Sequence, residues 1–492
     1  MTRFALLLSL LALVGCGDDG SPPRLDAGRL DAGGRDAGPR PDAARRDTGP
    51  TDCVENRSCS TGDPCEEGHE RCGSGTRVCE ATAPAAADTP CTGGVCDGMG
   101  ACLTVEDGVL IASDAALFDA FGGAIDLDGD RAIIGMGSPV SGTYGDAAYV
   151  FERDTGGRWR EVARPATGDP TAGQFGVAVA ISGGRVVIGS PGASHAGGMN
   201  AGAVYVWERQ SDGSWMETDR LVAGDAAAYQ RFGRAVDLDG DRLIVGRYSN
   251  GEIPGDGGAA YGFEHGTGGW LEVSLLTPSE AAEGDRFGAS VAIDGDAALV
   301  GAPDDDRPGL TDAGSVWLFG RQSDASWIEE GRLTASDAAD GDAFGTHVGL
   351  SGVRVIVGAP RADLGTISDA GAAYVFELRS GSVAREGKLM ASDAAVEDGF
   401  GVVAVSGDLA LVGSPRNDRV GRRDTGAAYV YSRASDGTWS EARKIVAGMT
   451  ETDDRFGSYV ALDGARALVG APGDDHGGDS DAGSVYFFDP VP

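Results

Sequence analysis

Residues 344–360 read FGTHVGLSGVRVIVGAP, and the Phe-Gly pair that opens this stretch recurs at seven evenly spaced positions in the 492-residue chain. The pairs begin at residues 121, 175, 232, 287, 344, 400 and 456, with spacings of 54 to 57 residues. A period this regular indicates that one supersecondary unit is copied seven times.

Each copy except the last contains four short apolar runs that are bounded by glycine, aspartate and proline. In the fifth copy these runs lie at residues 344–351, 353–360, 371–377 and 388–392. Runs of this length and composition predict strands, and Asp-Gly pairs such as Asp294-Gly295 between the first two runs predict tight hairpins. Seven four-stranded antiparallel units arranged radially make an all-β fold, a seven-bladed β-propeller.

The two ends of the repeat array complement each other. The last copy stops after GSVYFFDPVP (483–492) and lacks a fourth run. At the other end, VLIASDAALFDAFG (109–122) aligns with RLTASDAADGDAFG (332–345). We therefore predict that residues 109–112 supply the fourth strand of the blade that begins at Phe456, which would cover an exposed sheet edge.

A second motif follows the Phe-Gly pairs and suggests a family. Gly-Ala-Pro occurs at 301–303, 358–360 and 470–472, and Gly-Ser-Pro at 189–191 and 413–415. This combination resembles the FG-GAP repeat family, whose best-known members form the propeller of integrin α subunits, over roughly residues 105 to 492. The resemblance implies an adhesion-type role. The calcium-binding turn of integrin-like members is not expected here, because turns such as LDGDR are several residues shorter and lack the final acid.

The N-terminal segment predicts export and a lipid anchor. Residues 1–15 contain one early basic residue and an apolar run too short to span a bilayer, which is typical of a signal peptide. Leu13-Val14-Gly15-Cys16 resembles a bacterial lipobox, which implies lipidation of Cys16 and a cell-envelope, outer-membrane location, either surface-exposed or periplasmic. A plain signal peptide is the alternative. Residues 16–51 repeat Asp-Ala-Gly and predict a disordered tether.

Cysteines other than Cys16 are confined to residues 52–102, directly ahead of the predicted propeller at 103–492. Their even number in a small exported segment predicts a disulfide-rich module whose pairing the sequence leaves open, and a zinc site is the alternative. The predicted disulfide cysteines are Cys53, Cys59, Cys65, Cys72, Cys79, Cys91, Cys96 and Cys102.

Acidic residues gather in the loops between the second and third runs and in the loops between copies. Alternation of strand direction would place all of these longer loops on one face. Crowded carboxylates suit Ca²⁺, a hard cation with oxygen ligands, although aspartate is also an ordinary residue of solvated turns. The candidate metal ligands are Asp304, Asp305, Asp306, Asp312, Asp474, Asp475, Asp479 and Asp481.

Charge and missing motifs narrow the function. A formal net charge of −36 excludes nucleic acid as a partner, because the phosphate backbone would be repelled. We find no nucleophile elbow, phosphate-binding loop or regular histidine spacing, so we predict no catalytic residues. The favoured function is a non-catalytic, lipid-anchored surface module that binds an extracellular protein, glycan or matrix partner. The alternative is an extracellular carbohydrate-active lyase or hydrolase with its site at the mouth of the propeller channel.

Overall fold

The computed structural model describes residues 106–137, 147–248, 253–280, 282–379, 382–419, 421–448, 451–475 and 480–491, together with six short strands before residue 105. The predicted signal peptide, Cys16 and tether lie outside the described residues, as do the side chains on which the disulfide prediction depends. No helix of membrane-spanning length and hydropathy occurs in the described part of the chain. The six short strands are β1 (Ser58–Ser60), β2 (Glu66–Gly73), β3 (Thr76–Pro84), β4 (Pro90–Cys91), β5 (Gly94–Cys96) and β6 (Cys102–Thr104).

Seven antiparallel blades of four strands follow, which confirms the predicted all-β propeller. Blade 1 comprises β8 (Phe121–Asp128), β9 (Arg131–Met136), β10 (Ala148–Arg153) and β11 (Trp159–Ala163). Blade 2 comprises β12 (Ala178–Ser182), β13 (Arg185–Ser190), β14 (Ala203–Arg209) and β15 (Trp215–Leu221). Blade 3 comprises β16 (Ala235–Asp239), β17 (Arg242–Arg247), β18 (Ala259–Gly266) and β19 (Gly269–Leu276).

The remaining blades have the same order. Blade 4 comprises β20 (Ser290–Asp294), β21 (Ala297–Ala302), β22 (Ser315–Arg321) and β23 (Trp327–Leu333). Blade 5 comprises β24 (His347–Ser351), β25 (Arg354–Ala359), β26 (Ala372–Arg379) and β27 (Ser382–Leu389). Blade 6 comprises β28 (Val402–Ser406), β29 (Leu409–Ser414), β30 (Ala427–Arg433) and β31 (Trp439–Ile445). Blade 7 comprises β32 (Tyr459–Asp463), β33 (Arg466–Ala471), β34 (Ser484–Phe488) and, paired with β34, β7 (Gly108–Leu110).

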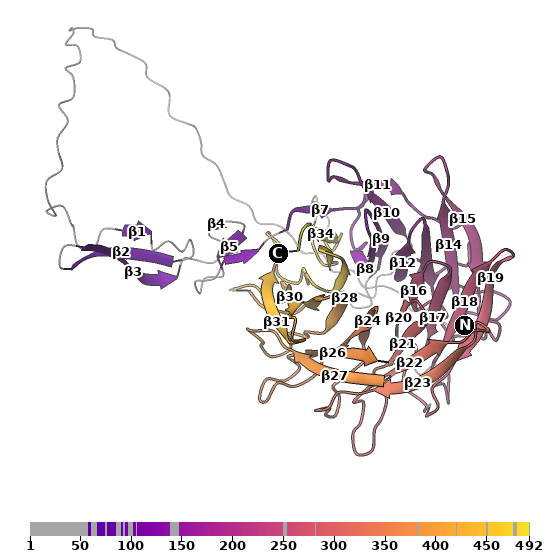
Figure 1. Cartoon of the computed structure of the whole chain (residues 1–492). Helices are drawn as coiled ribbons and strands as arrows, with labels where there is room; N and C mark the ends of the chain where they lie inside the picture. Colours follow the sequence, from indigo (N-terminus) through magenta and orange to yellow (C-terminus); the bar gives the residue numbers. More distant parts are fainter. Residues whose placement is uncertain are drawn as a thin grey trace, which may run out of the picture. The chain divides into compact units, whose positions relative to one another are not determined.

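The first strand of each blade faces the centre of the ring, and the fourth strand lies at its rim (Figure 1). Neighbouring first strands pack against one another around the ring, including β32 of blade 7 against β8 of blade 1. The seven-fold repetition of the sequence therefore appears as a ring of like sectors around one axis.

The phenylalanine of each Phe-Gly pair is buried at the junction between blades. In blade 5 the ring of Phe344 meets that of Tyr374 edge-to-face, with centroids 5.5 Å apart. The same pairing recurs in blades 1, 2, 3, 6 and 7, and Trp317 takes the tyrosine position in blade 4. Edge-to-face aromatic pairs add specific geometry to apolar burial. The recurring tyrosines are core residues, since they are completely or almost completely buried.

Two glycines from adjacent blades meet at each inner junction. The Gly413 Cα of blade 6 lies against the carbonyl group of Gly457 in blade 7, so that a Cβ on Gly413 would stand 2.0 Å from that oxygen. Equivalent approaches of 1.8 to 2.4 Å occur at every junction, from Gly135 with Gly176 round to Gly470 with Gly122. The second glycine of each pair has positive φ, such as 92° at Gly457. The two glycines of the repeat motif are thus required because the backbones touch.

A second ring of contacts joins the hairpins on the opposite side of the propeller from the longer loops. In each blade the turn glycine N–H donates to an aspartate or serine side chain of the preceding blade. Gly295 donates to Asp239 at 2.8 Å, and Gly129 of blade 1 donates to Asp463 of blade 7 at 2.7 Å. All seven junctions have this bond, so the ring closes through blades 7 and 1 as well.

Two carboxylates on first strands also join neighbouring blades. Asp126 of β8 accepts the N–H of Ile181 in the next blade at 2.7 Å, and Asp237 of β16 accepts that of Ile293 at 2.7 Å. Burial raises the pKa of Asp126 to about 8, and the negative charge of Asp237 adds to this effect. Burial likewise raises the pKa of Asp237 to about 6.

Substitution of Gly413 by alanine is expected to destabilise the propeller by about 1–3 kcal/mol or more, because the added Cβ must displace the backbone of blade 7. The matched control is Gly331→Ala, since a Cβ at Gly331 meets nothing within 4 Å. Urea denaturation of both variants measures the difference. Equal midpoints for the two variants would show that the glycine contact does not constrain the fold.

The raised pKa of Asp126 predicts a pH dependence of stability. The folded protein retains a proton on Asp126 between about pH 4 and 8 that the unfolded chain has released, so this contribution to stability is complete below pH 4 and is lost as pH rises toward 8. In Asp126→Asn, the fall in the free energy of unfolding with rising pH should be smaller by up to about 1.4 kcal/mol per pH unit. Denaturation series at several pH values, with exposed Glu283→Gln as the charge-matched control, measure the slopes. An unchanged slope in Asp126→Asn would contradict the assignment.

Candidate functional site

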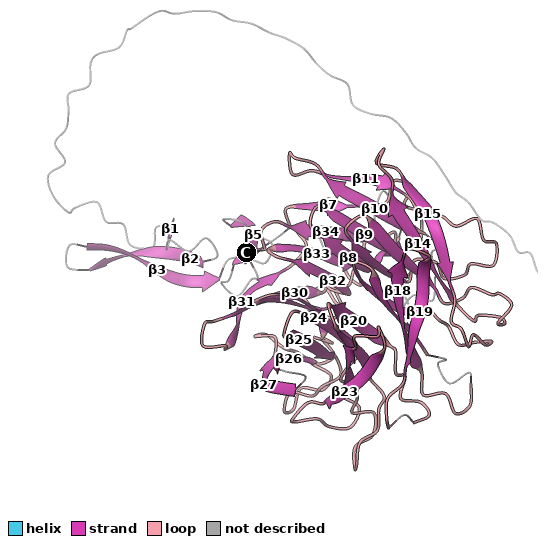
Figure 2. Cartoon of the chain, turned by 45° about the vertical axis from the view of Figure 1, so that its right-hand side comes forward, coloured by secondary structure: helices cyan, strands magenta, loops and turns pink. Residues whose placement is uncertain are grey.

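The loops between strands two and three and the loops between blades lie on one face, which we call the loop face. Strand order within each sheet is sequential and antiparallel, so alternate connections emerge on the same side (Figure 2). Backbone hydrogen bonds join the two kinds of loop across the blade junctions. The N–H of Gly341 donates to the Thr311 carbonyl at 2.8 Å, and that of Asp453 donates to the Arg423 carbonyl at 3.0 Å.

The predicted metal ligands of blade 4 have partners within the protein. Asp304 pairs with Arg286, and Asp305 pairs with Arg332. The Asp306 carboxylate accepts the N–H of Asp312 at 3.0 Å. Three of these four carboxylates are therefore engaged by guanidinium or backbone donors, and the fourth residue, Asp312, has a positive φ of 49°.

The contact between Asp306 and Asp312 recurs as a loop-closing bond. A first aspartate accepts the N–H of a second aspartate six residues later, at 2.9 Å in each case, in the pairs Asp363 with Asp369, Asp418 with Asp424, and Asp475 with Asp481. The second aspartate has φ near 50° in all of them. Aspartate tolerates this conformation better than most residues and readily accepts local backbone donors. These acids thus stabilise the loops of blades 4 to 7.

Two of the predicted ligands of blade 7 also have partners within the protein. Asp474 accepts the hydroxyl of Tyr486 at 2.6 Å, and Asp475 takes part in the loop-closing bond. Asp479 lies outside the described residues. Burial, followed by the charges of Asp474 and Asp475, raises the pKa of nearby Asp454 to about 7. Among the residues with described positions, no group of three His, Cys, Asp or Glu side chains is arranged to hold a metal ion, and calcium binding stays a prediction.

A large cavity lies at the centre of the ring and opens on the loop face. It has a volume of about 830 Å³ and is lined by the first strands of all seven blades and by loop residues beside them. The strand side chains that line it are small and apolar, such as Val179, Val236 and Val291. Its polar lining includes Tyr248, Tyr459 and His347. Burial lowers the pKa of His347 to about 4, so this imidazole is neutral at neutral pH.

Arginines from five consecutive blades give this cavity a cationic lining. They are Arg234, Arg286, Arg361, Arg416 and Arg455, and the acids that line the cavity with them are Asp369 and Glu397. The sequence analysis did not single out these arginines. A signal was present, because Arg361 and Arg416 directly follow the proline of Gly-Ala-Pro and Gly-Ser-Pro in adjacent repeats.

The five arginines differ in what they contact. Arg286 is paired with Asp304, and the Arg234 Nε donates to the Tyr248 hydroxyl at 3.0 Å. Arg361 and Arg416 are exposed, and among the described residues neither side chain has a hydrogen bond or ion pair. The Arg455 Nε is buried without a hydrogen-bond partner in the same part of the chain, as is the Nδ1 of His347. Buried polar atoms are seldom left unpaired, so these two atoms are exceptions among the residues that line the cavity.

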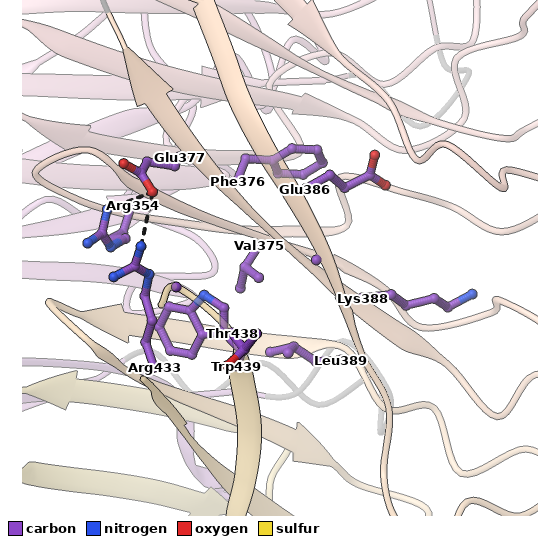
Figure 3. Close-up of a pocket in the computed structure, with 12 residues that line it drawn as sticks. Arg354, Val375, Phe376, Glu377, Glu386, Lys388, Leu389, Arg433, Thr438 and Trp439 are labelled. Carbon is purple, nitrogen blue, oxygen red and sulfur yellow. Dashed lines mark hydrogen bonds and ion pairs between the residues drawn. The ribbon is translucent and has the colours of Figure 1, made fainter. Parts of the chain in front are cut away.

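A second, smaller cavity lies between the outer strands of blades 5 and 6 (Figure 3). Its volume is about 190 Å³, and Trp439 and Leu389 form part of its wall. Its charged side chains have partners: Arg433 donates to Glu377 at 3.1 Å, and Lys388 pairs with Asp337 at 2.7 Å. These contacts join adjacent blades, so we assign this cavity to packing rather than to ligand binding.

Comparisons with known proteins agree with the repeat motif. The FG-GAP repeat family matches six segments, residues 159–207, 215–263, 270–319, 327–376, 383–431 and 439–488. Each segment runs from the fourth strand of one blade through the third strand of the next. No curated protein matches the chain. A crystal structure of a protein from Lactobacillus plantarum is similar, with a TM-score of 0.45 and 15% identity over 69% of this chain and 88% of that one. Because the matched segments cover more than half of its residues, the chain belongs to the FG-GAP repeat family.

Proposed function

We propose that this protein is a non-catalytic binding module of the bacterial cell envelope, held at the outer membrane through lipidated Cys16, whose loop face binds an extracellular protein, glycan or matrix partner. The observation that carries the proposal is the cavity of about 830 Å³ that opens among the loops of the loop face. Ligand sites are typically concave and mostly apolar, with a few placed polar groups. The cavity has this composition.

Catalysis is the second candidate, favoured by the same cavity because it contains tyrosine, histidine and arginine side chains. An extracellular lyase or hydrolase would need an acid and a base directed at one reacting atom. Two acids line the cavity: Asp369, whose backbone N–H donates in a loop-closing bond, and Glu397, which is exposed. The binding function needs only the shape and the charge, and we prefer it for that reason.

Calcium assistance is part of the proposal, with blade 7 as its first location. Asp454, Asp474 and Asp475 are close enough for the last two to raise the pKa of the first. A divalent cation would relieve this repulsion, since carboxylate oxygens are preferred calcium ligands.

We also propose that the N-terminal strand closes blade 7 and holds the loop face rigid. The pairing of β7 with β34, Tyr486 opposite Val109, supports this. Glu106 supports it too, because its carboxylate accepts the N–H of Gly448 at 2.8 Å. The same position in other blades is taken by a fourth-strand glutamate, such as Glu272, which accepts Gly224 N–H at 2.8 Å.

Closure by β7 predicts that Leu110→Ala destabilises the propeller by about 2–5 kcal/mol, the usual cost of truncating a core leucine. Leu110 is 5% exposed and packs in the cluster that contains Phe121 and Val485. The neighbouring Ile111 is 47% exposed and provides the matched control, Ile111→Ala. Thermal and urea unfolding of both variants are measured. Equal stability of the two variants would refute closure by this strand.

The binding function predicts retention on a subset of an array of bacterial and host glycans and matrix proteins, without turnover of any retained polysaccharide. The full chain is assayed with calcium and with a chelator, and calcium should strengthen retention and raise the melting temperature. Asp474→Asn should remove the calcium effect. Degradation of a retained polysaccharide would establish the enzymatic alternative, and no retention of any kind would reject the binding function.

A further inference from the structure

The strongest unexplained feature of the loop face is a group of arginines in a chain with net charge −36. Arg361, Arg416 and Arg455 come from blades 5, 6 and 7 and line the same end of the central cavity. Arg361 and Arg416 occupy equivalent positions in neighbouring repeats, directly after the motif proline. They therefore stand side by side around the ring, and Arg455 follows in the next inter-blade loop.

Most other arginines in the described blades pair with acids between strands or blades. Arg185 pairs with Glu208 at 2.8 Å, and Arg209 pairs with Glu152 at 2.6 Å. Arg361 and Arg416 depart from this rule, since no acid or carbonyl among the described residues accepts from their side chains. Structural stabilisation does not account for two unpaired guanidinium groups at the mouth of a cavity.

We propose that these arginines bind the negatively charged groups of an acidic oligosaccharide whose end enters the central cavity, an inference that rests on the proposed binding function and names its ligand class. Guanidinium groups suit planar, bidentate recognition of carboxylate and sulfate groups. The seven blades enclose the cavity on all sides, so a ligand must enter end-on, as a chain end can and a folded protein surface cannot.

The cavity contains further groups that suit a sugar. Tyr248 and Tyr459 are among the residues that line it. The volume of about 830 Å³ is in the range of small-molecule sites, which is large enough for a short oligosaccharide.

The negative charge of the whole chain does not prevent anion binding at this point. Interactions between exposed charges are largely screened beyond about 8 Å at physiological salt, so the charges that line the cavity dominate. Five arginines line it against two acids, Asp369 and Glu397, and one arginine is neutralised by Asp304. Glu397 is exposed on the rim and opposes an anionic ligand.

The test uses the full chain and isothermal titration calorimetry with trigalacturonate, its methyl ester and triglutamate as probes. We expect trigalacturonate to bind, with an affinity that falls as ionic strength rises, and the uncharged ester to bind at least about tenfold more weakly. Failure of trigalacturonate to bind at low ionic strength would overturn the proposal. Tighter binding of triglutamate than of trigalacturonate would overturn its assignment to a sugar.

Variants locate the site. Arg361→Gln and Arg416→Gln should each weaken trigalacturonate binding by about tenfold, and Glu397→Gln should strengthen it, because a repulsive charge is removed. Arg423→Gln, at an exposed arginine of the loop face outside the cavity lining, is the matched control and should leave affinity unchanged. Thermal unfolding checks that all four variants fold. Unchanged affinity in both Arg361→Gln and Arg416→Gln would refute the site.

The array described above separates this inference from the function on which it rests. If the double variant Arg361→Gln/Arg416→Gln retains every array partner of the native chain, the loop face binds its partners elsewhere and the cavity proposal alone fails. If trigalacturonate binds but the array retains nothing, the cavity proposal stands and the broader partner-binding function fails.

Discussion

The contact between two glycines at each blade junction is the constraint on which the rest of the propeller depends. The first glycine of Gly-Ala-Pro or Gly-Ser-Pro abuts the carbonyl of the glycine in the next Phe-Gly pair, with no room for a Cβ on either side of most junctions. Both motif glycines are therefore explained by one backbone approach. The distance between blades at the axis is set there, and the fully buried phenylalanine beside it fills the widening wedge between sheets.

On the opposite face, hydrogen bonds between the short hairpins hold each blade against the preceding one. Each turn glycine donates to the preceding blade, and the last bond joins blade 7 to blade 1 through Asp463 and Gly129. The ring is thus closed at the hairpin turns, independently of β7. Rigid attachment at the axis and at the hairpins leaves the longer loops free to vary in sequence without loss of the fold, which is where binding residues are commonly placed.

The repeat, its four strands and its blade number were predictable because each is encoded locally, in the spacing of Phe-Gly and in the turn residues. The arginine cluster was not, because its members lie in different repeats and only ring closure brings Arg234 and Arg455 to one cavity. The crowding of acids in the loops was predicted from the sequence. The partners of their carboxylates were not. Asp304 was an apparent ligand in sequence, and its guanidinium partner Arg286 lies eighteen residues earlier, in the loop that leads into the same blade. Only the fourth repeat has an arginine and an aspartate at these two positions, so the pairing is not part of the repeated pattern.

The positions of the charged residues say more about a binding partner than the net charge of the chain does. Acids are abundant because each loop needs one residue that accepts a local N–H, as at Asp363 and Asp418, and a second that tolerates positive φ, as at Asp369 and Asp424. Much of the loop-face acidity thus follows from backbone conformation and says little about a partner. Some loop arginines also have positive φ, namely Arg231, Arg286 and Arg455, but Arg361 and Arg416 do not. A guanidinium group that is left unpaired beside a cavity, as at Arg361 and Arg416, is therefore the feature of the loop face that backbone requirements do not explain, and the chemistry of the ligand is best inferred from it.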